Sequence, residues 1–186
     1  MRTLHDAEGL PAGAVNLVSE TGAAVAQYLV SSSNVDVISF TGSNQVGQKI
    51  MEAAAPTMKK LSLELGGKSS CIVFDDVDVP AVANALATAA TIISGQQCTA
   101  ARRVIVHEAC YAQMAQALIR CLSDVRVGDG LVPHMQMGPL IDNVARDHIE
   151  QRVAATLDSA DKVLLRGGRP QGQSQGCFLL PTLVAH

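Results

Sequence analysis

A strand–helix–strand pattern in the N-terminal part of the chain constrains the fold more than any other feature of the sequence. Residues 14–18 form a short apolar run of strand length, and residues 21–30 have the apolar spacing of a helix. Residues 35–40 then read as a second strand. Two strands joined through a helix lie parallel in one sheet, with a right-handed crossover. We therefore predict an α/β fold with a parallel sheet of the doubly wound type.

The same alternation continues along the rest of the chain. Strands are expected within residues 61–65, 70–74, 102–108, 162–168 and 177–182, and helices within residues 82–93, 110–125 and 142–157. Hydrophobic residues make up 48% of the 186 residues and charged residues 17%, which is typical of a globular protein with a buried core and not of a disordered chain. The length allows one ordinary domain or parts of two.

Charge and hydropathy argue against two classes of partner. The net charge is −3 and the fourteen basic residues are scattered, so the chain lacks the basic stripe with which proteins bind nucleic acid. No apolar run approaches the roughly 18 residues of a membrane-spanning helix. Residues 1–6 also lack the apolar core and cleavage site of a secretion signal. We therefore expect no nucleic-acid or membrane partner and a cytoplasmic protein.

One of the five cysteines stands in an unusual setting. Cys98 follows a glycine and two glutamines, which should leave its sulfur accessible and its backbone N–H groups free. The other four lie in apolar surroundings and are expected in the core: Cys71, Cys110, Cys121 and Cys177. No C-x-x-C pair is present, which argues against a disulfide framework and a zinc ribbon. Cys98 is thus a candidate nucleophile, although a thiol needs a nearby base or dipole to ionise at neutral pH.

A carboxylate upstream is the candidate base. Glu64 stands between Leu63 and Leu65, ahead of two glycines. The flanking leucines predict a partly desolvated carboxylate that could activate water.

Three nearby aspartates invite comparison with a metal site. Asp75, Asp76 and Asp78 precede a predicted helix. A calcium loop would also need a central glycine and a distal glutamate, and neither is present. We expect no metal site here and interpret the acidic residues as favourable charges at a helix N-terminus.

A glycine turn follows the strand at residues 35–40. Residues 41–47 read Thr-Gly-Ser-Asn-Gln-Val-Gly and lead into an amphipathic helix. Such a turn presents free N–H groups and a positive dipole end, which suits a pyrophosphate. The pattern is not the G-x-G-x-x-G fingerprint, and by itself it is far more often a plain strand-to-helix connection.

These motifs together resemble one family. The E-L-G-G-K run at residues 64–68, the G-Q-x-C run at residues 95–98 and their separation are similar to signatures of the aldehyde dehydrogenase superfamily. The F-T-G-S run at residues 40–43 resembles its cofactor turn, and the G-P-L-I run at residues 138–141 is also similar. The resemblance covers almost the whole chain.

The resemblance implies a fold and an activity. Residues 1–66 would be the back half of a Rossmann-like cofactor domain and residues 67–186 the first part of an α/β catalytic domain. The chain would belong to an enzyme that oxidises an aldehyde to a carboxylic acid with NAD or NADP, through a thiohemiacetal and a thioester. The implied catalytic residues are the nucleophile Cys98 and the base Glu64; the implied cofactor contacts are Gly42, Ser43, Gly47 and the carbonyl of Leu65.

Other parts of the family pattern are not found in the chain. The P-W-N and K-P-S/A-E runs would precede Met1, and the E-I-F-G-P run and the strand that joins subunits would follow His186. Ile93 also stands where the family often has asparagine. We therefore expect a middle segment of a subunit whose full-length relatives are homo-oligomeric, without turnover by the segment alone. The alternative is a truncated relative that acts at most as a binding or scaffold module. The aldehyde and the choice between NAD and NADP stay open.

Overall fold

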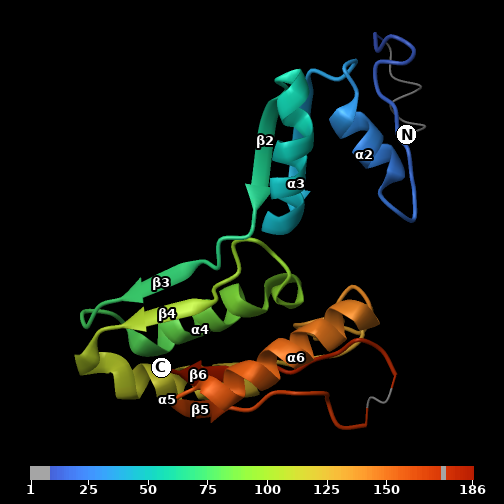
Figure 1. The fold of residues 1–186 in the computed structure, drawn as a ribbon. Helices are drawn as coiled ribbons and strands as arrows, with labels where there is room; N and C mark the ends of the chain where they lie inside the picture. Colours follow the sequence, from blue (N-terminus) through green and yellow to red (C-terminus); the bar gives the residue numbers. More distant parts are fainter. Residues whose placement is uncertain (1–8, 173–174) are drawn as a thin grey trace. The chain divides into compact units, whose positions relative to one another are not determined.

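The computed structural model describes residues 9–172 and 175–186 (Figure 1). The chain divides into two compact units, one ending at Gly66 and one beginning at Gly67. Residues 1–6, on which the expected lack of a secretion signal rests, lie outside the described residues. In the part that is described, no helix is long and apolar enough to cross a membrane.

The first unit is a two-stranded parallel sheet with helices packed on it. Its elements are α2 (Ala24–Ser31), β1 (Val37–Gly42), α3 (Asn44–Ala54), a short 3₁₀ turn (Ala55–Thr57) and β2 (Lys60–Leu65). The strands pair in parallel from Val37 opposite Lys60 to Gly42 opposite Leu65. The core comprises Val30, Ile50 and Ala54, with Ile38, Phe40, Leu61 and Leu63 packed against them. The α/β prediction is therefore confirmed, with the crossover running through α3 (Figure 1).

The strand predicted at residues 14–18 is wrong. These residues form neither helix nor strand, and Leu17 and Val18 are 69% and 63% exposed. An extended apolar segment becomes a strand only when a neighbouring strand completes its hydrogen-bond ladder. Within the described residues β1 pairs with β2 alone, and no strand lies beside residues 14–18.

The second unit combines a parallel and an antiparallel strand pair with three long helices (Figure 1). Its elements are β3 (Ser70–Val73), α4 (Val79–Thr91), a 3₁₀ turn (Ile92–Gly95), β4 (Arg103–Val106), α5 (Glu108–Ser123), α6 (Asn143–Ser159), β5 (Lys162–Leu165) and β6 (Leu183–Ala185). Strands β3 and β4 are parallel, whereas β5 and β6 are antiparallel.

Helices α4 and α5 pack on β3 and β4 around a small core. Its buried members are Val73, Ala83, Leu86, Cys110, Met114, Ala117 and Leu118. The buried alanines of α4, Ala83 and Ala87, lie one turn apart, and α5 contributes Ala117, so small side chains lie on the buried faces of both helices. Of the four cysteines expected in the core, Cys110 is buried and Cys71 and Cys121 pack at its margin. Cys177 is half-buried outside this cluster, with its Sγ 3.3 Å from Asn143 Oδ1.

Aspartates begin two of these helices. Asp78 accepts a hydrogen bond from Ala81 N–H at the start of α4, and Asp142 accepts one from Ala145 N–H at the start of α6. Each carboxylate satisfies an N–H group that lacks a partner within its helix. The described residues contain no group of three or more side chains able to hold a metal ion.

The strand predicted at residues 177–182 is also wrong, because strand pairing is displaced toward the C-terminus. Leu180 makes one isolated bridge to Gly168, and the paired strand β6 begins only at Leu183. Pro181 interrupts the run, and proline has no N–H group to donate to a ladder.

The core of the second unit generates a stability prediction. Met114 is 0% exposed, so Met114→Ala should lower the free energy of unfolding by about 2–5 kcal/mol through lost burial and a residual cavity. Met135, which is 38% exposed, provides the matched control, and Met135→Ala should change stability by no more than about 0.5 kcal/mol. Urea unfolding followed by circular dichroism measures both. Equal losses in the two variants would show that α4 and α5 do not pack around Met114.

Candidate active site

The first unit brings five of the predicted site residues together at one edge of its sheet. In the register of the two strands, Thr41 lies opposite Glu64 and Gly42 opposite Leu65. Both strands end here, and the turn into α3 follows directly. In parallel α/β sheets ligands bind at this carboxyl edge. The register thus places Glu64 and Leu65 next to the glycine turn.

The start of α3 is able to hold an anion. Ser43 caps the helix: its Oγ accepts a hydrogen bond from Val46 N–H at 3.3 Å, and its carbonyl accepts one from Gly47 N–H at 2.9 Å. The N–H groups of Asn44 and Gln45 have no acceptor among the described residues. Two unpaired N–H groups at the positive end of a helix dipole fit a phosphate of a nucleotide cofactor.

The absence of a side chain at position 47 gives α3 room beside Leu65. A Cβ placed on Gly47 would lie 2.7 and 2.8 Å from the two Cδ atoms of Leu65, so that leucine would have to move. Gly47 is buried, and α3 packs close to β2 at this point. The close approach fixes the start of α3 against the end of β2.

Glu64 is exposed, which corrects the expectation that its leucine neighbours desolvate it. Side chains alternate between the two faces of a strand. Leu63 and Leu65 therefore turn toward the packed face of β2, and Glu64 turns away from it. In the described structure the carboxylate is accessible to water.

Cys98 belongs to the second unit and lies in the loop after α4. The residue is exposed, as expected from its polar neighbours. Its N–H group has no acceptor among the described residues, and its carbonyl oxygen is 3.4 Å from Ser69 Oγ. An accessible thiol with an available N–H group on the same residue is an arrangement suited to nucleophilic attack on a carbonyl group.

Side chains from the loop anchor it to a distant segment. Ser94 Oγ donates to Gly138 O at 2.9 Å, and Gln96 Oε1 accepts from Ile141 N–H at 3.1 Å. Gln96 Nε2 also donates to Ile93 O at 3.2 Å. Sequence patterns did not reveal these two contacts, because the partners of Ser94 and Gln96 lie 44 and 45 residues further along the chain.

The loop backbone is strained. Ile93, Ser94 and Gly95 have positive φ angles of 48°, 54° and 71°, the left-handed region. Glycine adopts this region readily, but a β-branched side chain there is a marked outlier. Lys68, in the E-L-G-G-K run, is left-handed as well, and its carbonyl accepts two hydrogen bonds from the Arg103 guanidinium at 3.0 and 3.2 Å.

Fold and site together define a class: an α/β protein with a glycine turn that opens a helix in one unit and an exposed loop cysteine in the other. The aldehyde dehydrogenase family model matches residues 1–186. The chain belongs to the aldehyde dehydrogenase family.

Individual relatives agree with this assignment. The chain is 38% identical over 179 residues to the mitochondrial succinate-semialdehyde dehydrogenase of Oryza sativa, covering 96% of this chain and 33% of that protein. It is 39% identical over 177 residues to the NADP(+) succinate-semialdehyde dehydrogenase of Escherichia coli, covering 95% and 36%. The chain thus spans about a third of the length of these relatives.

Solved structures have the same fold. Betaine aldehyde dehydrogenase from Staphylococcus aureus, in complex with NAD+, superposes with a TM-score of 0.89 at 31% identity, over 95% of this chain and 36% of that one. Aldehyde dehydrogenase C from Pseudomonas syringae, in complex with NAD+ and octanal, gives a TM-score of 0.87 at 32% identity, over 91% and 35%.

The strained loop generates a prediction. Ile93→Asn should raise the free energy of unfolding by about 1 kcal/mol, because asparagine tolerates the left-handed region that costs a branched side chain about 1–2 kcal/mol. Ile93 is 65% exposed, so little burial is lost. The matched control is Ile92→Asn, at a position with φ −54° that gains nothing from the change. Urea unfolding compares the two variants, and an unchanged or lowered stability in Ile93→Asn would mean that the loop is unstrained.

Proposed function

We propose that this chain supplies the nucleophile, the base and one phosphate-binding turn of an NAD- or NADP-dependent aldehyde dehydrogenase. The observation that carries the proposal is the exposed Cys98 with its unpaired N–H group, within a chain that matches the family from residue 1 to residue 186. The substrate class is an aldehyde and the product a carboxylic acid.

The proposed reaction begins at Cys98. Its thiolate attacks the aldehyde carbon, a C–S bond forms, and the Cys98 N–H group donates to the developing oxyanion. Loss of hydride from that carbon gives a thioester on Cys98. Water then attacks the thioester carbon, the C–S bond breaks, and the carboxylic acid leaves as the thiol is restored. When bound, NAD or NADP supplies the acceptor for the hydride.

Glu64 is the proposed base for the hydrolysis. Its exposure lets a water molecule reach the carboxylate, which would accept the proton as the water attacks. In the strand register it lies opposite Thr41, next to the glycine turn, which supports this role.

Four residues are proposed to hold the cofactor. Gly42 and Ser43 form the turn that would lie against the phosphates, with the free N–H groups at the start of α3 beside them. Gly47 would let the helix remain close to the sheet, and the Leu65 carbonyl would accept from the nicotinamide amide. The names of relatives include both an NADP(+) enzyme and a structure with NAD+, so we propose either dinucleotide.

The cellular setting is proposed more broadly. We propose a cytoplasmic protein that acts on a small aldehyde and has no nucleic-acid or membrane partner. The chain would be a segment of one subunit of a homo-oligomer. The scattered basic residues support this part of the proposal. Relatives with succinate-semialdehyde, aminoaldehyde and betaine aldehyde in their names all fit this substrate class.

The nucleophile assignment predicts the order in which the thiols react. With limiting iodoacetamide, Cys98 should be alkylated first, because it alone of the five cysteines is exposed. Peptide mass mapping of the folded chain measures the order, and circular dichroism before the reaction verifies that it is folded. Buried Cys110 serves as the internal control. Earlier labelling of any other cysteine in folded protein would contradict the assignment.

The base assignment predicts a split between two kinetic phases. In a full-length subunit that carries this chain, Glu64→Gln should keep a rapid burst of NADH or NADPH, while steady-state turnover falls by roughly 10²–10⁴ because hydrolysis loses its base. Glu52→Gln, an exposed change on α3, is the matched control and should leave both phases intact.

Stopped-flow absorbance separates the phases. Unchanged turnover in Glu64→Gln would remove Glu64 from the mechanism. Aldehyde oxidation that persists in Cys98→Ala would overturn the nucleophile, and with it the proposed function.

A further inference from the structure

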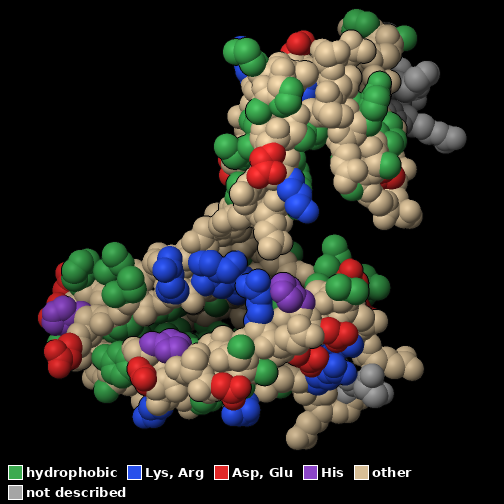
Figure 2. All heavy atoms as spheres, in the orientation of Figure 1, with side chains coloured by type: hydrophobic (Ala, Val, Ile, Leu, Met, Phe, Trp, Pro, Cys, Tyr) green, Lys and Arg blue, Asp and Glu red, His purple; other side chains and the backbone are tan. Residues whose placement is uncertain are grey.

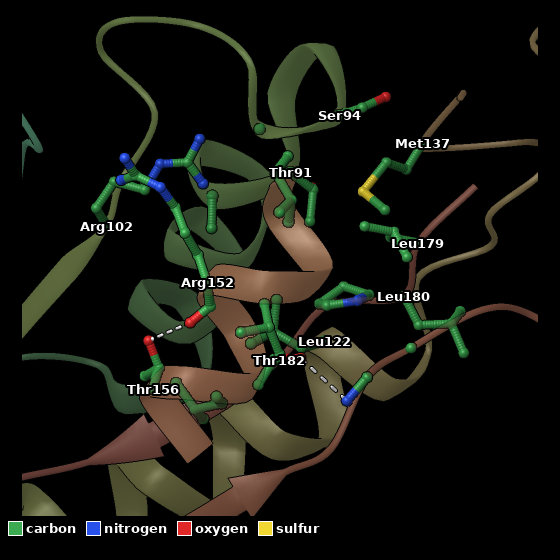
Figure 3. A pocket seen from close by; sticks show the side chains of 18 of the residues that line it. Thr91, Ser94, Arg102, Leu122, Met137, Arg152, Thr156, Leu179, Leu180 and Thr182 are labelled. Atoms are coloured by element: carbon green, nitrogen blue, oxygen red, sulfur yellow. Dashed lines mark hydrogen bonds between the residues drawn. The ribbon is translucent and has the colours of Figure 1, made fainter. Parts of the chain in front are cut away.

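The second unit contains a pocket that the proposed reaction does not use. Its volume is about 870 Å³, comparable to that of small-molecule sites, and it is partly open to solvent. Residues of α4, α5, α6 and the segment at residues 179–183 line it (Figure 3). Ser94 and Gly95 of the cysteine loop border it, but Cys98 does not. The pocket is therefore distinct from the candidate active site in the same unit.

One end of the pocket is cationic. The side chains of Arg102 and Arg152 both extend to this end (Figure 3), and Lys68 and Arg166 also line the pocket. Figure 2 shows Lys and Arg side chains gathered along a hollow of the second unit. Among the described residues, none of these four cations has a salt bridge to a carboxylate.

The one acidic side chain in the lining is already engaged. Glu150 accepts two hydrogen bonds from the Arg169 guanidinium, both at 2.7 Å. This pairing lowers the pKa of the Glu150 carboxyl below its ordinary value, so the carboxylate remains charged and bound to Arg169. It therefore does not neutralise the arginines at the cationic end.

Both arginines are held in position by protein atoms. A Cβ at Gly95 would lie 2.9 Å from Arg102 Nη1, so the guanidinium packs directly against the loop backbone. This partial burial lowers the pKa of Arg102, although an arginine stays protonated at neutral pH. Arg152 Nε donates to His148 Nε2 at 3.2 Å. An arginine with one N–H group engaged keeps its others free to donate.

The rest of the lining is apolar. Buried side chains from three segments contribute to it: Leu86, Leu118, Leu122, Met137 and Leu140. Met137, Leu179 and Leu180 lie away from the two arginines (Figure 3). A pocket with guanidinium groups at one end and leucines elsewhere is complementary to an anion that carries a hydrocarbon tail.

We propose that this pocket binds an amphipathic carboxylate, with its carboxylate between Arg102 and Arg152 and its alkyl chain against the leucines. Guanidinium groups match the two oxygens of a carboxylate in geometry as well as in charge. Burial of the alkyl chain adds affinity with each methylene group. Cys98 does not line the pocket, so a ligand bound there would leave the Cys98 sulfur unoccupied.

Isothermal titration calorimetry of the 186-residue chain with decanoate tests the proposal. Decanoate should bind at least tenfold more tightly than butyrate, which has the same head group and a shorter tail, and more tightly than decyltrimethylammonium, which has the tail and the opposite charge. Arg152→Gln and Arg102→Gln should each weaken decanoate binding roughly tenfold, the usual effect of losing a charge-assisted hydrogen bond. Arg152→Lys should lose less than Arg152→Gln.

Arg120→Gln is the matched control, because Arg120 is an exposed arginine on α5 that does not line the pocket. It should bind decanoate as the unmodified chain does, and thermal melts should show all variants folded. The proposal is overturned if decanoate does not bind, if Arg120→Gln weakens binding as much as Arg152→Gln, or if the cationic surfactant binds equally well. Inorganic phosphate that displaces decanoate at equal concentration would also overturn it, since the tail would then contribute nothing.

Discussion

The loop that presents Cys98 depends on a balance between backbone strain and a few long-range hydrogen bonds. Left-handed residues other than glycine cost of order 1–3 kcal/mol each and persist only where the surroundings impose them. Here two side chains impose the shape, Ser94 on the carbonyl of Gly138 and Gln96 on the N–H of Ile141. Each such bond contributes about 1 kcal/mol, so the two together offset much of the strain. The Cys98 side chain is exposed, but these two hydrogen bonds fix the backbone of the loop that carries it.

In the first unit, close packing between α3 and β2 fixes the backbone of the candidate site, as hydrogen bonds fix the cysteine loop. The absence of a side chain at Gly47 lets α3 press against Leu65, and the parallel register then sets Gly42 opposite that leucine. The turn and the helix start are therefore positioned by backbone geometry together with the Ser43 cap, and Glu64 is positioned by the strand register. This explains why Glu64 is both well placed and exposed.

Much of this arrangement could be predicted from the sequence, because it follows from local patterns. The order of strands and helices, the Asp142 cap and the exposure of Cys98 all come from residues that are close together in the chain. The errors have non-local or stereochemical causes. Residues 14–18 have strand composition, but a strand needs a ladder partner, which no single segment can reveal.

The site shows the same division between local and distant information. Neighbours in sequence suggested that Leu63 and Leu65 would desolvate Glu64, whereas strand geometry places neighbours on opposite faces. The roles of Ser94 and Arg102 depend on contacts that sequence patterns do not encode.

Arg102 shows how these contacts link the cysteine loop and the pocket of the second unit. Its guanidinium packs against Gly95, three residues before Cys98, and also lines the neighbouring pocket. A single side chain thus supports the cysteine loop on one side and contributes positive charge to the pocket on the other. Because a larger residue at position 95 would displace Arg102, the glycine of the G-Q-x-C run is required for this contact as well as for its left-handed backbone.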